Sequence, residues 1–397
     1  MADGTREVWI TGIGIVSSLG EGLEAHWTAL QEARPRVDLA TFAPYLVHPL
    51  APLDFDKQIP KKGDQRQMEP WQRIGTYAAG LALDSARVKG NADILSRTDM
   101  IVAAGGGERD VAVDANIMTG QPNAANPGAY LNERLMNDLR PTLFLAQLSN
   151  LLAGNISIVH GVTGSSRTFM GEEAAGIDAV RIAFSRITSG QSDIVLVGGA
   201  HNAERPDLLM IKEFGGYNLK NAFSPVWQRG PKGGLVLGSL GAFLVLEARP
   251  HAEARNAAHI ATLRSVASER SSRKPGQVAA TLERMWQGIA GRLTAGRHAV
   301  ISGATGAEPA TGEERAFLEQ HPDTAVRASG TLIGHGDEPQ FVMNVALAAL
   351  SLSRGSLYPP SDGSGAERPM ADTLTQVVVT GVGHASGEGL ALVEAAP

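Results

Sequence analysis

The side chains that could do chemistry in this sequence are carboxylates and histidines, because the chain contains no cysteine. Disulfides, thiolate metal sites and every mechanism with a cysteine nucleophile are therefore excluded. Glu172 and Glu173 stand at the predicted start of a helix, where free backbone N–H groups favour negative charge. His335 stands beside glycines in the stretch GTLIGH. Helix-start acids and a lone histidine of this kind are also common as purely structural residues, so both interpretations stay open.

Two other kinds of site have little support in the sequence. The ten histidines include no H-x-x-x-H or comparable ligand pair, so we expect no metal and no cofactor. Gly12 and Gly14 follow an apolar run, as in a dinucleotide-binding loop, but a third glycine is missing at the required spacing. We therefore reject a dinucleotide-binding motif.

The composition is that of an ordinary globular α/β protein. With 397 residues, 43% of them hydrophobic, the chain can build one large domain or two closely joined ones. Its 46 glycines and many short Val- and Ile-rich runs predict α/β layering with tight turns. A net charge of -6 gives no reason to expect nucleic-acid binding. Because no signal segment or long apolar run is present, we expect a cytoplasmic protein without a membrane span.

The elements that must position these side chains follow from the apolar patterns. Residues 7–16 predict a buried strand that runs into a glycine turn, and a helix follows over residues 21–31. Further along, residues 173–189 predict a helix that ends at a glycine, and the strand DIVLVGGA follows it. Near the C-terminus, residues 376–394 predict strand, turn and strand, an order similar to that of the N-terminal stretch.

The middle of the chain gives weaker patterns. Polar turns dominate residues 120–141, so we expect an irregular segment there. NISIVHG at 155–161 predicts a short buried strand, and LVLGSLGAFLVLE at 235–247 predicts a β-hairpin interrupted by small residues.

Four stretches, in order along nearly the whole chain, carry the pattern of one enzyme family. They are VWITGIGIVSSLGEGLEAHWTAL, the helix and strand that end in DIVLVGGA, the run VLGSLGAFLVLEARPHAEARNA, and GTLIGH. In these stretches the chain resembles the β-ketoacyl-acyl-carrier-protein synthases. The resemblance implies a thiolase-like αβαβα fold of five layers, built from two similar halves, which we place at residues 1–250 and 251–397.

The residue at the position of the family's nucleophile is not a cysteine. In that family a Cys at the N-terminus of a buried helix receives the acyl chain, because the helix dipole and backbone N–H groups lower its pKa. Counting back from the glycines of DIVLVGGA, with Gly176 on the family's Cys-x-x-Gly pattern, places Glu173 at the Cys position. Attack by a carboxylate on a thioester would give a high-energy mixed anhydride, so stable acyl loading is not expected there.

The partners of that nucleophile are mostly missing as well. The first family histidine, in a His-Gly-Thr-x-Thr motif, falls at Gly303, or at Ser302 if a gap is allowed. The second family histidine matches His335, and the Lys that precedes it matches Gly330. One of four expected groups remains, and without its partners a structural role for His335 is favoured.

Two further stretches resemble parts of the family's site. GVGH at 381–384 is similar to its Gly-Phe-Gly-Gly gate, with Val382 in place of the aromatic residue and His384 in place of a glycine. Lys61, Lys62 and Arg66 precede MEPWQ, which resembles the helix start where relatives meet the acidic carrier protein. A solvated basic loop is the alternative for these three residues.

The resemblance implies a degenerate subunit of fatty acid or polyketide chain elongation, similar to chain-length-factor subunits. Its partners would be the acyl carrier protein and a Cys-containing synthase, joined as a heterodimer, or as a homodimer, through a strand near 155–161. One alternative is an acyl-thioester decarboxylase or hydrolase that uses Glu173 and His335, although Glu173 would repel a malonyl carboxylate. Another is a non-enzymatic homodimer that binds acyl chains or the carrier protein.

Overall fold

Five strands form the N-terminal half of the central sheet. They are β1 (Val8–Ser17), β4 (Asp99–Ala103), β5 (Ser166–Phe169), β6 (Ile194–His201) and β8 (Leu240–Ala248). In the computed structural model, which describes residues 6–370 and 372–397, they lie in the order β5-β4-β6-β8-β1. β4 is parallel to β5 and β6, whereas β8 is antiparallel to β6 and β1. Most of these residues are buried on both faces, which explains their continuous apolar runs.

The C-terminal half repeats this arrangement. Its strands are β9 (Ala261–Glu269), β10 (His298–Ser302), β11 (Ala325–Ala328), β12 (Gln376–Val382) and β13 (Glu388–Ala395), in the order β11-β10-β12-β13-β9. β10 is parallel to β11 and β12, and β13 is antiparallel to β12 and β9. Numbered within each half, both strand orders are 3-2-4-5-1, so the expectation of two similar halves is confirmed. A short antiparallel contact between β1 and β9 joins them.

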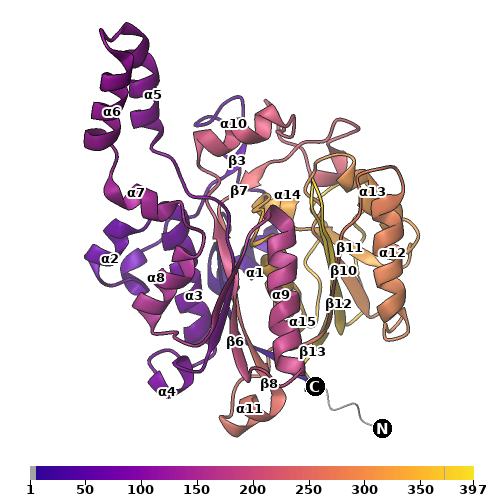
Figure 1. The fold of residues 1–397 in the computed structure, drawn as a ribbon. Coiled ribbons are helices and arrows are strands. Elements are labelled where there is room, and N and C mark those ends of the chain that lie inside the picture. The colour runs from indigo at the N-terminus through magenta and orange to yellow at the C-terminus, as the bar shows by residue number, and fades with distance from the viewer. Residues whose placement is uncertain (1–5, 371) are drawn as a thin grey trace.

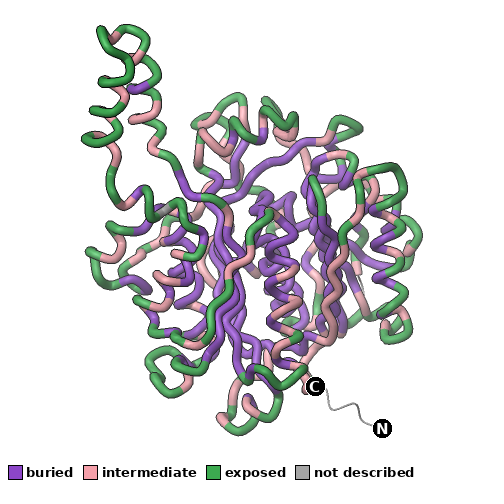
Figure 2. Tube along the Cα trace, viewed as in Figure 1, coloured by how far each residue is buried: buried purple, intermediate pink, exposed green. Residues whose placement is uncertain are grey.

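Helices complete five layers around the two halves of the sheet (Figure 1). α9 (Glu172–Thr188) and α15 (Gln340–Ser353) lie between the halves. The outer faces are covered by α3 (Pro70–Ser85) and α8 (Leu151–His160) on one side, and by α12 (Gln277–Ala290) and α13 (Ala310–Leu318) on the other. Residues 340–352 of α15 are all buried, as expected for a helix enclosed by two sheet layers (Figure 2). The predicted αβαβα fold is confirmed.

Two strand predictions are wrong. Residues 155–160 belong to α8, whose buried face is Leu152, Ala153, Ile156 and His160 while Ile158 is exposed. That spacing is helical, and a short β-branched run alone cannot separate the two structures. The edge strand nearest in sequence is β5, which begins at Ser166, six residues after α8 ends at His160.

The second wrong prediction is the hairpin over residues 235–247. β7 (Leu237–Gly238) pairs in parallel with β3 (Val47–His48), whereas β8 pairs with β1 and β6. A side chain at Gly238 would lie 2.0 Å from the carbonyl oxygen of Ile333, so the glycine permits close approach of two backbones rather than a hairpin turn.

Residues 120–141 are also more regular than predicted. α5 (Val111–Gly120) and α6 (Pro127–Asp138) form a helical hairpin that projects from the body of the molecule and is mostly exposed (Figures 1 and 2). The side chains of Asp110 and Asn126 accept hydrogen bonds from the first turns of these helices and so cap them. Ile117 is their single buried residue among those described.

Among the described residues, no helix has both the length and the apolar character that a membrane span requires.

Shorter elements connect these layers. The remaining elements are β2 (Gly20–Glu21), α1 (Gly22–Glu32), η1 (Phe55–Lys57), α2 (Lys62–Gln67), α4 (Ala92–Leu95), η2 (Gln121–Asn123), α7 (Pro141–Ala146), α10 (Pro206–Phe214), η3 (Val226–Gln228), α11 (Arg249–Ala254) and α14 (Gly330–Ile333).

Candidate functional site

Glu173 lies between the two halves of the fold, in the first turn of α9, and its side chain is 5% exposed. The chain reaches this helix through Gly171 and Glu172, which have φ values of +125° and +54°. A glutamate in the left-handed region is uncommon, and such conformations concentrate at functional sites. The free N–H groups at the helix start stabilise the negative charge of Glu173.

Two histidines meet the Glu173 carboxylate. His335 follows α14, and its Nε2 lies 2.8 Å from Glu173 Oε1. His384 lies in the turn between β12 and β13, and its Nδ1 is 2.8 Å from the same oxygen, to which its backbone N–H also donates at 3.2 Å. The structure therefore brings three of the predicted site residues together from distant parts of the sequence.

Two residues that sequence analysis missed complete this group. Asp337 Oδ1 lies 3.2 Å from His335 Nε2 and 3.2 Å from Lys212 Nζ. Lys212 reaches inward from α10, and its ammonium lies 3.5 Å from His384 Nε2. Asp337, two positions after His335, could have been found in the sequence, whereas no motif marks Lys212. We call Glu173, His335, Asp337, His384 and Lys212 the Glu173 cluster; all five are buried.

The charges of the cluster stabilise one another. Burial alone would raise the pKa of Glu173, but hydrogen bonds from His335 and His384 hold that pKa well below its usual range. Burial alone would lower the pKa of His335, yet hydrogen bonds to Asp337 and Glu173 raise it to about 9. Lys212 likewise holds the pKa of Asp337 far below its ordinary value. Buried charges persist when they are paired in this way, so the carboxylates are ionised at neutral pH.

The position predicted for the first family histidine, Gly303, has no space for a side chain. A Cβ at Gly303 would lie 2.6 Å from the carbonyl oxygen of Thr380. The hydroxyl of the neighbouring Ser302 donates a hydrogen bond to the buried Glu314 at 2.7 Å, so this hydroxyl is directed at Glu314 rather than at Glu173. An imidazole is therefore excluded at Gly303 unless the backbone moves.

The other predicted positions contribute no polar side chain. Gly330 starts α14, where an added Cβ would lie 3.2 Å from the carbonyl oxygen of Ala304. Val382 packs in an apolar cluster with Leu390 and Leu392 of β13, so it fills space beside the turn that carries His384.

The predicted docking residues lie on the surface, away from the Glu173 cluster. Lys62 and Arg66 belong to α2, Lys61 precedes it, and all three are exposed. Lys62 Nζ already pairs with Asp56 Oδ1 at 2.5 Å. A role in docking the carrier protein stays a prediction.

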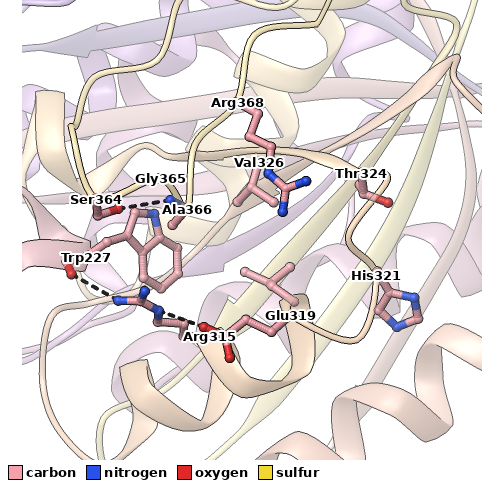
Figure 3. A pocket seen from close by; sticks show the side chains of 11 residues that line it. Trp227, Arg315, Glu319, His321, Thr324, Val326, Ser364, Gly365, Ala366 and Arg368 are labelled. Carbon is pink, nitrogen blue, oxygen red and sulfur yellow. Dashed lines mark hydrogen bonds and ion pairs between the residues drawn. The ribbon is translucent and has the colours of Figure 1, made fainter.

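A pocket of about 180 Å³ lies in the C-terminal half (Figure 3). Its guanidinium groups are engaged: Arg315 donates to the carbonyl oxygen of Trp227 and pairs with Glu319, and Arg368 donates to the carbonyl oxygen of Pro322. No member of the Glu173 cluster lines it, so the pocket is separate from the candidate site.

Comparison with known proteins places the chain in a family. The family model described as "Beta-ketoacyl synthase, N-terminal domain" matches residues 5–250, more than half of the chain. This chain belongs to the β-ketoacyl synthase family. This match agrees with the resemblance found in the sequence.

Individual relatives are distant. The 3-oxoacyl-[acyl-carrier-protein] synthase 2 of Vibrio harveyi is 26% identical over 64% of this chain and 60% of its own length, less than two thirds of that relative. The tetracenomycin polyketide synthase ketoacyl synthase beta subunit of Streptomyces glaucescens is 27% identical over 91% of this chain and 89% of its own. The solved structure titled "The ishigamide ketosynthase/chain length factor" has a TM-score of 0.79 at 18% identity, covering 99% and 100% of the two chains. At that identity the likeness shows the fold.

Proposed function

We propose that this β-ketoacyl synthase family protein is a non-catalytic partner subunit of a Cys-containing synthase in fatty acid or polyketide chain elongation. One observation carries the proposal: the carboxylate of Glu173 stands at the buried helix start that we align with the family's nucleophile, and His335 and His384 both contact it. Because His335 and His384 hydrogen-bond to Glu173, these three side chains are paired with one another. None of them is then free to act as a nucleophile that receives an acyl chain.

The geometry beside Glu173 supports the same conclusion. Condensation in the family uses two histidines to act on the malonyl group, and the position of one of them is Gly303, where a side chain meets the Thr380 carbonyl. A carboxylate also places negative charge where the malonyl carboxylate would approach. Both the acylation step and the decarboxylation step are thus disfavoured in this chain.

Features of the surface and the names of relatives support a partner. β5 lies at one end of the sheet, and on its outer side no strand of the described chain pairs with it. An unpaired edge invites pairing with a strand of another chain. The tetracenomycin relative is named as a β subunit, and the ishigamide structure is titled as a ketosynthase with a chain length factor. We infer that the Cys-containing partner joins along β5.

The Vibrio harveyi relative is named as an acyl-carrier-protein enzyme. By extension we propose that the acyl carrier protein is a further partner, that it meets the exposed Lys61, Lys62 and Arg66, and that the assembly is cytoplasmic. Such a contact would weaken with added salt, because exposed charges are screened.

Catalysis by the Glu173 cluster itself is the second candidate. His335 Nε2 lies between the carboxylates of Glu173 and Asp337, an arrangement that could move protons during decarboxylation or hydrolysis of an acyl thioester. We rank it second because His335 and His384 already hold Glu173 Oε1, and His335 and Lys212 already hold Asp337 Oδ1.

Co-expression with a Cys-containing β-ketoacyl synthase from the same organism tests the proposal. Size measurements would show whether a heterodimer forms, and a carrier-protein elongation assay would compare each subunit alone with both together. We expect a heterodimer that is active only when both chains are present, with Glu173→Gln retaining most of that activity. Acyl-thioester turnover by this chain alone, abolished in Glu173→Gln, would establish the second candidate instead. A stable homodimer that does not bind the synthase would support the alternative of a non-enzymatic protein that binds acyl chains or the carrier protein.

A further inference from the structure

Four buried side chains of the Glu173 cluster form a set of metal ligands. Glu173, His335, Asp337 and His384 each offer one ligand atom, and these atoms all lie within 4.8 Å of one another. Three of the separations are 2.8, 2.8 and 3.2 Å. Tetrahedral zinc with bonds of about 2.0–2.2 Å would place its ligand atoms about 3.3–3.6 Å apart, so these three pairs would each move apart by less than about 1 Å. We propose that these four residues bind one divalent transition-metal ion of the zinc class.

The charge of the region supports a cation. Glu172, Glu173 and Asp337 supply three negative charges, and Lys212, which contacts both Glu172 and Asp337, supplies one positive charge. With neutral imidazoles the net charge is therefore -2; Glu172 is half-buried, and the fully buried Glu173, Asp337 and Lys212 alone leave a net charge of -1, which is costly to bury. Glu338, buried beside His201, adds further negative charge. One divalent ion with neutral histidines balances the first three acids, as would protonation of both His335 and His384, and an experiment can distinguish these two arrangements.

One carboxylate oxygen of the Glu173 cluster lacks a hydrogen-bond donor among the described residues. Glu173 Oε2 is buried and accepts no hydrogen bond from any residue in the described part of the chain. Buried acceptors of this kind are rare and call for an explanation, such as an ion. A metal bound by both carboxylate oxygens would account for it.

The surroundings also fit a metal-binding histidine. Glu172 Oε1 lies 3.4 Å from His384 Nε2, on the opposite side of the ring from the Nδ1 that faces Glu173. Metal-binding histidines commonly donate their second N–H to a carboxylate, which fixes the tautomer. Lys212 Nζ lies 3.2 Å from Asp337 Oδ1 and 3.5 Å from the same His384 Nε2, so the Asp337 carboxylate would be shared between the lysine and the ion.

The expectation of no metal relied on histidine pairs close in sequence. The fold instead collects ligands from the start of α9, from the segment after α14 and from the turn between β12 and β13. A metal here would tie these three segments together in the interior of the protein. The inference does not depend on the proposed partner, since it concerns the isolated chain.

The test is metal binding by the purified chain without a polyhistidine tag. After removal of metals by a chelator, the protein would be titrated with Zn²⁺ and with Co²⁺, whose visible absorption reports a protein ligand field. We expect one equivalent to bind and the thermal midpoint to rise. Glu173→Gln and His384→Gln should each lose stoichiometric binding, and Glu172→Gln should weaken affinity by about 10- to 100-fold. His298→Gln, on β10 and outside the ligand set, is the matched control.

Circular dichroism would show that each variant is folded. If a variant does not fold, the absorption spectrum of the Co²⁺-loaded wild type, with its imidazole and carboxylate ligands, still tests the proposal. Absence of stoichiometric binding by the wild type, or equal binding by wild type and His384→Gln, would overturn it and leave two protonated histidines as the neutralising groups.

Discussion

Replacing Glu314 by glutamine should stabilise the protein at alkaline pH relative to the wild type. The Glu314 carboxyl is fully buried; Ser302 and Thr380 donate hydrogen bonds to its Oε1, and its Oε2 has no partner among the described residues. Burial raises the pKa of Glu314 from its ordinary value of 4.5 to about 7, although the two hydrogen bonds oppose the shift. The folded protein therefore holds a proton on Glu314 that the unfolded chain has already lost near pH 6.

The sign and size of the effect follow from linkage. Between about pH 4.5 and pH 7 the unfolded chain binds fewer protons at this residue than the folded chain, so the free energy of unfolding falls as pH rises. The contribution is fully present below pH 4.5 and lost above pH 7. A difference of about 2.5 between the two pKa values corresponds to about 3 kcal/mol. Glutamine does not titrate and keeps a neutral amide in the same space.

Urea unfolding of wild type and Glu314→Gln at pH 5 and pH 8 measures this effect. We expect the stability difference between the two proteins to change by about 3 kcal/mol in favour of the variant at the higher pH. Glu319→Gln, an exposed acid just after the same helix, controls for the general loss of a charge. A difference that stays constant with pH, or a wild type that gains stability relative to Glu314→Gln as pH rises, would show that the carboxyl is not protonated in the folded state.

Three further outcomes are expected. Glu173→Cys should give no condensing activity in a carrier-protein elongation assay, because Gly303 leaves no imidazole to act on the malonyl group; any condensation product would contradict this. Gly303→Ala should lower the free energy of unfolding by about 1–3 kcal/mol, since its Cβ meets the Thr380 carbonyl, and unchanged urea unfolding would refute the close contact. Lys212→Met should lower the free energy of unfolding by up to about 3–5 kcal/mol, because Asp337 loses its ammonium partner and keeps only the contact with His335 at that oxygen; an unchanged thermal midpoint would contradict this.

The sequence predicted the elements whose ends carry strong signals. The helix expected over residues 173–189 is α9 (Glu172–Thr188). It could be predicted because a glycine and then a long buried strand follow it. The run at 155–161 was assigned to a strand because β-branched residues favour strands, whereas its burial follows a helical period that is visible only after packing. The α5–α6 hairpin is not predictable from hydrophobic periodicity, because it has almost no buried face and therefore little apolar pattern.

The site was partly predictable for a different reason. Glu173, His335 and His384 were found because they fall within recognisable stretches of the family pattern. Lys212 contacts Asp337, which is 125 residues away in sequence, through a side chain that turns inward from a short helix with an exposed apolar face. Nothing in the local spacing around Lys212 distinguishes it from a surface lysine, because a contact of this kind arises from the tertiary fold.

The projecting α5–α6 hairpin has a consequence for how this protein can vary. Its caps lie within its own sequence, and Met118 and Met136 are each 75% exposed, so the hairpin hardly takes part in the packing of the sheet. Changes in its length or surface therefore carry little thermodynamic penalty for the five-layer body. Natural selection can remodel this appendage while the interior stays constant, and related chains should diverge here faster than anywhere in the central sheet.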